Sequence, residues 1–269
     1  MNNTELDYES IYLLEVKTVQ SSAFRILIEA LKEILTDSNI EFDENGMKIV
    51  AMDASHTVLV HLRLDGINFE QYYCKSKLVL GINMMNFFKL IKTMNNNDTL
   101  TLFLEKENIN ELGIRIENGD KNTITNYKLN LMDLNEETIS VPPASFTSVI
   151  TMPANDFQKI CRDMNNLADS IEIKSIENQL LFSCKGDFAS QETIMGETNS
   201  GMNFIKKQQS NDIVQGVFAL KHLVLFTKCT NLCNSIEIYL KNDYPLIIKY
   251  SVASLGEIKL CLAPLCNNI

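Results

Sequence analysis

The sequence is poor in the residues that build glycine-rich nucleotide sites. Only ten glycines occur among 269 residues, and no two of them form a Gly-x-Gly triplet. Gly196 and Gly201 have the spacing of a phosphate-binding P-loop, but Met202 and Asn203 stand where that loop needs Lys and then Ser or Thr. The sequence therefore provides no support for nucleotide binding, and we predict no cofactor.

Zinc-type spacings, disulfide patterns and membrane segments are also missing. An odd number of scattered cysteines fits reduced core thiols better than a disulfide framework. They are Cys74, Cys161, Cys184, Cys229, Cys233, Cys261 and Cys266, and neither they nor the three histidines have the usual zinc spacings. No apolar run approaches the roughly 18 residues that span a bilayer, and the polar start MNNTELDYES is unlike a signal peptide. We therefore expect a soluble intracellular protein without a structural metal.

One short stretch, MDASH at 52–56, contains residue types used in nucleophilic catalysis. A working triad needs Asp, His and Ser to converge from different directions beside an oxyanion hole, and the G-x-S-x-G elbow is absent. Asp53, Ser55 and His56 lie instead on one turn, where short polar side chains commonly bond their own backbone. We predict no catalytic residues and no enzyme. A hydrolase that uses His56 is the alternative from another functional class.

Hydrophobic periodicity predicts an α+β protein built twice from one unit. With 269 residues and 45% hydrophobic content, the chain can form two domains with separate cores. A strand, a short helix and a strand recur at 78–104 and 217–240, which indicates a duplicated domain. Because strands and helices do not alternate regularly, we expect mostly antiparallel sheets. The predicted domains are 12–130 and 146–269, joined by an acidic, proline-containing connector at 131–145.

The same patterns predict the individual elements. Helices are expected at 21–35, 84–94, 153–166 and 220–229, two in each half. Strands are expected at 12–19, 40–42, 47–53, 57–64, 69–74, 78–82, 99–105, 111–117, 127–131, 146–152, 170–175, 179–185, 188–195, 216–219, 235–240, 246–251 and 257–263. Residues 1–11 should form a loose arm, and one further strand should lie within 196–212.

Positive charge is concentrated on the predicted helices of an acidic chain with a net charge of −10. The four helices carry 8 − 4 = +4, which leaves 16 − 30 = −14 elsewhere. Their basic residues are Arg25, Lys32, Lys89, Lys92, Lys159, Arg162, Lys221 and Lys228. Ordinary solvated faces with pairs such as Arg25–Glu29 are one interpretation. A basic surface on an acidic body also suits sequence-independent binding of a phosphate backbone, and duplex DNA is favoured because no aromatic platform for single strands is evident.

Six short motifs follow one another in a specific order: EALKEIL at 29–35, MDASH at 52–56, YKLNLMDL at 127–134, ICRDM at 160–164, FTK at 226–228 and LAP at 262–264. In that order and spacing the chain resembles the proliferating cell nuclear antigen family, the eukaryotic-type DNA sliding clamps. The resemblance implies a duplicated two-domain fold with two helices per domain, and three chains closed head to tail. The eight basic residues would then face duplex DNA inside the ring.

The resemblance also implies partners and a place of action. A separate ATP-dependent clamp loader would open the ring, and a DNA polymerase and other replication proteins would bind through short clamp-binding peptides. The chain would act in the nucleus, or at a cytoplasmic replication site if it is viral. One subunit of a heterotrimeric checkpoint clamp, or a specialised second clamp, is the neighbouring alternative.

The family's partner groove lies beneath the connector and takes a peptide with Gln, an aliphatic residue and two aromatics. By resemblance its residues here would be Met52, His56, Leu59, Ile139, Val141, Ala219, Pro245, Leu262, Ala263 and Pro264, with Ala219 and Ala263 beside the glutamine. Thr57 stands where the family usually has Val, and Cys261 where it commonly has Tyr. We therefore expect a smaller and more polar groove with altered partner preference.

Ring closure is expected to use sheet edges. Tyr127, Leu129 and Leu131 lie on the strand that ends the first domain, and a bare strand edge is costly to leave unpaired. We predict that this edge pairs with strand 188–195 in the second domain of the next chain, so that the sheet continues across the subunit boundary.

Overall fold

The computed structural model describes residues 11–135, 139–141, 143–207 and 212–265. Within them the chain forms two compact units, one from 11–51, 61–139 and 252–257, and the other from 52–60, 140–251 and 258–265. Most of the predicted arm at 1–11, together with 136–138 and Pro142 of the connector, lies outside the described residues. No helix in the described ranges is long and apolar enough to cross a membrane.

The first unit contains an antiparallel sheet with the order β5-β1-β7-β8-β9. Its strands are β1 (Tyr12–Thr18), β5 (Gln71–Cys74), β7 (Thr99–Glu105), β8 (Asn108–Asn118) and β9 (Thr123–Asn130). In a second antiparallel group, β2 (Asp37–Asp43) pairs with β3 (Gly46–Met52) on one side and β6 (Leu78–Asn83) on the other. Buried residues alternate with half-buried ones along β2, whereas β7 is buried on both faces from Leu100 to Leu104.

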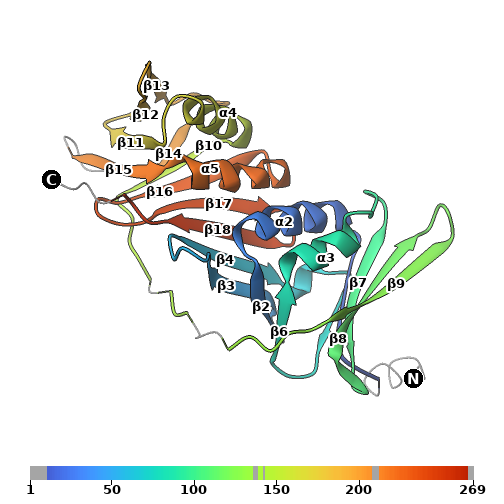
Figure 1. The fold of residues 1–269 in the computed structure, drawn as a ribbon. Coiled ribbons are helices and arrows are strands. Elements are labelled where there is room, and N and C mark those ends of the chain that lie inside the picture. The colour runs from blue at the N-terminus through green and yellow to red at the C-terminus, as the bar shows by residue number, and fades with distance from the viewer. Residues whose placement is uncertain (1–10, 136–138, 142, 208–211, 266–269) are drawn as a thin grey trace. The chain divides into compact units, whose positions relative to one another are not determined.

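Two helices, α2 (Ser21–Ile34) and α3 (Met84–Ile91), lie side by side in this unit (Figure 1). Each has apolar residues at helical spacing, and the rings of Phe24 and Phe87 meet edge to face with centroids 6.2 Å apart. Asn83 starts α3 because its side chain accepts a hydrogen bond from the amide of Asn86 at 2.9 Å. The helix ends at Ile91, so Lys92 is its C-cap residue.

The second unit repeats this plan with its own strands and helices. One sheet has the order β13-β12-β11-β15, and another antiparallel group has the order β14-β10-β16-β17. These strands are β10 (Ser148–Pro153), β11 (Ser170–Ile176), β12 (Gln179–Lys185), β13 (Ser190–Gly196), β14 (Asn203–Lys206), β15 (Ile213–Ala219), β16 (Ser235–Leu240) and β17 (Leu246–Val252). The helices are α4 (Ala154–Asn165), α5 (Leu220–Phe226) and the 3-10 helix η2 (Thr227–Leu232). The predicted duplicated α+β fold is confirmed.

Two further strands, β4 (Val58–Asp65) and β18 (Gly256–Leu262), contribute residues to both units. The division between units is therefore not a single cut in the sequence. The chain passes from the first unit to the second between Ile139 and Ser140. In addition, the segment 52–60 belongs to the second unit and the segment 252–257 to the first.

Several predicted boundaries were wrong. The helix predicted at 220–229 is α-helical only to Phe226, and Lys228 lies on η2. The strand predicted at 127–131 begins four residues earlier, because the hairpin turn falls just before Thr123, at Asn122 with φ 48°. The strand predicted at 188–195 begins at Ser190, since the amide of Gly186 donates to the carbonyl of Ala189 and closes a turn.

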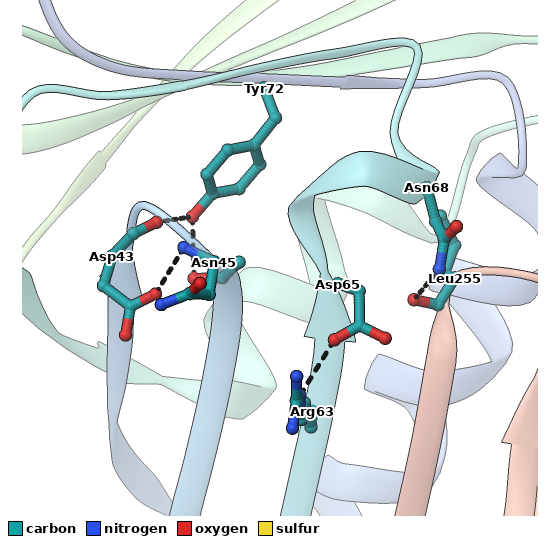
Figure 2. Close-up of polar contacts among 8 residues, drawn as sticks. Asp43, Asn45, Arg63, Asp65, Asn68, Tyr72 and Leu255 are labelled. Carbon is teal, nitrogen blue, oxygen red and sulfur yellow. Dashed lines mark hydrogen bonds and ion pairs between the residues drawn. The ribbon is translucent and has the colours of Figure 1, made fainter.

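A cluster of turns in the first unit shows how its strands are held (Figure 2). The Tyr72 hydroxyl on β5 lies 2.7 Å from the carbonyl oxygens of both Asp43 and Gly46 at the β2–β3 turn. The Leu255 carbonyl accepts from the amide of Asp65 at 2.9 Å and from the Asn68 side chain at 3.3 Å (Figure 2). Burial, followed by the neighbouring Cys74 and Asp43, raises the pKa of Tyr72 well above its ordinary value. The hydroxyl therefore stays protonated and donates.

Tyr72→Phe should lower the free energy of unfolding by about 1 kcal/mol, because it removes the hydroxyl that links β5 to this turn. Chemical denaturation measures the loss, and amide exchange at Asn45 and Gly46 should become faster. Tyr73→Phe on the same strand is the matched control, since its hydroxyl makes no hydrogen bond to another described residue. Equal destabilisation by both variants would contradict this role for Tyr72.

Candidate nucleic-acid interface and partner groove

The four basic residues of the first unit that were predicted to contact DNA differ in their exposure to solvent. Lys89 and Lys92 are exposed on α3 and its C-cap. Lys32 on α2 has a side chain only 10% exposed, and its ammonium is bonded to the Glu33 carboxylate and lies 4.9 Å from the centroid of the Phe88 ring. Arg25 is half-buried, and its buried Nε has no hydrogen-bond partner among the described residues. Lys32 and Arg25 are thus partly committed to the protein itself.

The second unit shows the same division. Lys159 on α4, Lys221 on α5 and Lys228 on η2 are exposed, and within the described residues no ion pair involves them. Arg162 on α4 is exposed, but its Nε lies 3.6 Å from the Asp163 carboxylate. An exposed ion pair of this kind is weak, so Arg162 can exchange Asp163 for another anion.

The excess positive charge is not spread evenly over the helices. α2 holds Arg25 and Lys32 with Glu29 and Glu33, and α4 holds Lys159 and Arg162 with Asp156 and Asp163, so each is neutral at 2 − 2 = 0. The whole net charge of +4 lies on α3 and its C-cap in the first unit and on α5 and η2 in the second. It comes from Lys89, Lys92, Lys221 and Lys228. These four exposed lysines are the strongest candidates for phosphate contacts.

The turn at 53–58 is shaped by one carboxylate. Asp53 accepts hydrogen bonds from the amides of Thr57 at 2.8 Å and Val58 at 2.7 Å, and from the Ser55 hydroxyl. His56 sits at the tip with φ 53°, exposed to solvent. Burial alone would raise the pKa of Asp53, but the hydrogen bonds from Ser55, Val58 and Thr57 outweigh it and lower the pKa. Asp53 and Ser55 are occupied in holding this turn, which is what the sequence predicted for them.

The carboxylate of Asp53 should stabilise the turn in a pH-dependent way. A lowered pKa means that the stabilisation is present above the ordinary value of 3.8 and is lost as pH falls through the folded-state pKa. Asp53→Ala should cost about 1 kcal/mol at neutral pH, as the loss of a capping carboxylate does elsewhere. Chemical denaturation at several pH values should show the difference shrinking below pH 3.8. Asp53→Asn, which keeps an acceptor oxygen, should cost less; an unchanged difference in acid would contradict the mechanism.

The other residues of the second unit that were predicted to line the groove vary in exposure. Met52 is 39% and Val141 41% exposed, and Leu59 is half-buried. Ala219, Pro245, Ala263 and Pro264 are also half-buried. Leu262, by contrast, is fully buried, so it supports the surface from beneath. Ile139 is half-buried and belongs to the first unit.

The two departures from the family pattern behave differently. Thr57 is half-buried, and its carbonyl accepts a hydrogen bond from the Ala263 amide at 3.0 Å, which ties the turn to the LAP segment. Cys261 is buried, and burial raises the pKa of its thiol to about 11. Cys261 is therefore a neutral apolar side chain at physiological pH, while Thr57 adds a hydroxyl near the surface.

His222, the third residue of α5, was not predicted from the sequence. Burial and the adjacent Lys221 lower the pKa of its imidazole, and the Asp53 carboxylate opposes them. His222 is thus a neutral group near Asp53 at physiological pH. A single histidine on an amphipathic helix has no recognisable motif, and only the fold brings it close to residue 53.

The candidate subunit edges are the end strands of their sheets. β9 is an end strand of the five-stranded sheet in the first unit, and β13 is an end strand of the four-stranded sheet in the second. Tyr127 is half-buried and Leu129 buried on β9, and Leu131 follows the strand, where its amide donates to the Asn110 carbonyl at 2.8 Å. The large apolar side chains exposed on these strands are Ile124, 62% exposed, and Ile194, 53% exposed. Neither was predicted, because Ile124 precedes the predicted strand and the alternation on β13 is too polar to single out Ile194.

Among the described residues, no group of three or more His, Cys, Asp or Glu side chains is placed to hold a metal ion. The cysteines in the described ranges are all free thiols. Burial raises the pKa of Cys161 and Cys229, in the second case to about 12. These buried thiols are protonated and packed as small apolar groups.

Comparison with known proteins accounts for nearly the whole chain. A family model described as "Proliferating cell nuclear antigen, N-terminal domain" matches residues 13–138, and one described as "Proliferating cell nuclear antigen, C-terminal domain" matches residues 140–265. The chain is 36% identical over 257 residues to "Probable DNA polymerase sliding clamp 1" of Paramecium bursaria Chlorella virus 1, which covers 94% of this chain and 97% of that protein. The two family matches meet at Ile139, where the chain passes from one structural unit to the other.

Proposed function

This chain belongs to the proliferating cell nuclear antigen family, and we propose that it works by closing with two further copies of itself into a ring around duplex DNA. It is a DNA sliding clamp, and as a processivity factor it serves DNA replication. The observation that carries the proposed mechanism is the distribution of charge: the excess cations lie on α3 and its C-cap in one unit and on α5 and η2 in the other, whereas the body of the chain is acidic.

Exposed lysines at corresponding places in two similar units are suited to contacting the phosphate backbone of DNA whatever the base sequence is. Phosphates recur along a duplex whatever its bases are, so a few weak contacts hold the DNA and let the ring slide. We propose Lys89, Lys92, Lys159, Lys221 and Lys228 as the main contacts, with Arg25, Lys32 and Arg162 in supporting positions.

Sheet edges support the closing of the ring. β9 in the first unit and β13 in the second each end a sheet, and each carries an exposed isoleucine. Antiparallel pairing of β9 with β13 of the next copy would satisfy both edges and bury Ile124 and Ile194. Because one chain carries both complementary edges, copies of the same chain can close the ring head to tail.

Proteins of this family are non-enzymatic scaffolds that bind DNA and DNA polymerases. We propose that this chain likewise lacks catalysis, and Asp53 and Ser55 serve the turn, not a triad. Polymerases and other replication proteins would dock a short peptide in the groove around Met52, Val141, Ala219 and Pro245, and a separate ATPase would load the ring. The place of action would be the site of DNA replication, in the nucleus or, if the chain is viral, in a cytoplasmic replication compartment.

Light scattering coupled to size-exclusion chromatography tests the ring. We expect three times the mass of one 30.5 kDa chain at micromolar concentration. Loaded rings should stay on circular DNA and slide off linear DNA with free ends. A strictly monomeric protein, or one that forms a ring only with two different chains, would contradict the homotrimer, and the second result would indicate a checkpoint-type clamp.

A further inference from the structure

Strand pairing gathers a row of side chains on one face of the second unit. Lys206 on β14 pairs with Val149 on β10, Val149 with Tyr239 on β16, and Tyr239 with Ile247 on β17. Residues directly opposite each other in an antiparallel ladder project from the same face of the sheet. Lys206, Tyr239 and Ile247 therefore belong to one surface, although they come from three different strands.

Two more aromatic rings join Tyr239 at the end of this row. Phe146, two residues before β10, meets Tyr239 edge to face with centroids 5.3 Å apart and Tyr244 with centroids 5.6 Å apart. All three rings are half-buried. A cluster of rings that is already ordered and partly open to solvent offers apolar contact area at a low cost in entropy.

Two lysines border the rings. The ammonium of Lys206 donates to the Phe146 carbonyl, and the ammonium of Lys241 lies 5.0 Å from the centroid of the Tyr244 ring. Within the part of the chain that the structure describes, neither lysine takes part in an ion pair. We call Phe146, Lys206, Tyr239, Lys241 and Tyr244 the aromatic–lysine face.

The charge of this surface is opposite in sign to that of the chain. Glu237 is bound to Lys249 at 2.7 Å and to the Tyr239 hydroxyl, and the exposed Asp243 lies in the same turn as Lys241. The net charge of this surface is 3 − 2 = +1, from Lys206, Lys241 and Lys249 with Glu237 and Asp243. The net charge of the whole chain is −10. An ammonium has three donors, so Lys206 can hold the Phe146 carbonyl and still bind a carboxylate.

We propose that the aromatic–lysine face binds an acidic segment that flanks the clamp-binding peptide of a partner protein. The inference rests on the proposed groove. The aromatic–lysine face adjoins that groove, because Tyr244 directly precedes the proposed groove residue Pro245. Carboxylates of the flank would meet Lys206 and Lys241, and an apolar side chain would pack on the rings. Single-stranded nucleic acid fits less well, since the rings meet edge to face and Lys241 covers the Tyr244 ring, which leaves little ring face for bases to stack on.

The test uses two fluorescein-labelled peptides with the same Gln, aliphatic and double-aromatic core. One carries four glutamates on each side of the core, and the other carries four glutamines. Two surface contacts should make the acidic-flank peptide bind about fivefold more tightly at low salt, and the advantage should vanish at high salt. Lys206→Gln/Lys241→Gln should abolish the advantage and leave the affinity for the glutamine-flanked peptide unchanged. Lys185→Gln, an exposed lysine on β12, is the control and should change neither affinity.

The outcomes separate this proposal from the groove itself. If both peptides bind the unmodified protein equally, or if the advantage survives in the double variant, the groove stands and the aromatic–lysine face is not its extension. If neither peptide binds, the groove assignment fails and this proposal falls with it. A 20-nucleotide oligo(dT) is the third probe: binding that depends on Lys206 and Lys241 would assign the face to single-stranded DNA and overturn the peptide proposal.

Discussion

Lys92→Gln/Lys221→Gln/Lys228→Gln should sharply weaken the hold of the closed ring on DNA. These lysines are exposed and without ion pairs among the described residues, so their positive charges are available to phosphates. The slope of log affinity against log salt should become less steep by up to about 0.9 for each phosphate that the ring no longer neutralises. The measurement is dissociation from end-blocked linear DNA at a series of salt concentrations, since blocked ends separate the strength of phosphate binding from topological linkage.

The matched control removes three charges that the protein already uses. Arg25→Gln/Lys32→Gln/Arg162→Gln should change the salt slope less, because Lys32 is paired with Glu33, Arg25 is half-buried, and Arg162 must first leave Asp163 to bind a phosphate. Trimer mass and peptide binding should stay unchanged in both sets. Equal weakening in the two sets would mean that DNA pulls the paired side chains free, and a stronger weakening in the control set would refute the assignment of the main contacts.

Ile124→Glu should dissociate the ring. If β9 pairs with β13 of the next copy, Ile124 leaves water on assembly, and a glutamate there must be desolvated or left at a disrupted edge. A cost of about 3 kcal/mol at each subunit boundary corresponds to an increase of roughly 100-fold in the dissociation constant. Analytical ultracentrifugation from nanomolar to micromolar concentration should show monomers where the unmodified protein is trimeric, and circular dichroism should show an unchanged fold.

Two exposed isoleucines that lie on neither β9 nor β13 provide controls for this variant. Ile109 on β8 is 57% exposed and Ile205 on β14 is 60% exposed, so Ile109→Glu and Ile205→Glu add the same charge to similar surfaces. Both should remain trimeric. Ile124→Glu/Ile194→Lys should recover part of the assembly, because the two new charges would attract each other across the boundary. Trimers that withstand Ile124→Glu would show that β9 is not the contact edge.

Local pattern alone was enough for much of the fold. Many strands and helices bury one side more deeply than the other, so alternation at 179–185 or helical spacing at 21–34 appears in the sequence before any contact is known. The duplication appeared in the same way, as one strand–helix–strand pattern repeated at half the chain length. The concentration of positive charge on the helices was also predicted from the sequence, because it depends only on which residues each helix contains. For these features the physical cause lies within a few residues along the chain.

The tertiary structure decided which of the candidate residues are available. Lys32 is held against Phe88, which comes from a different helix, and Leu262 is buried although its neighbours in LAP are not. The aromatic–lysine face exists only because β14, β10 and β16 pair in a particular register. The sequence determines which side chains the protein has and which face of its own element each one occupies. The free ends of long side chains are placed by neighbours from distant segments, and those neighbours are set by strand register and helix packing, which no local period encodes.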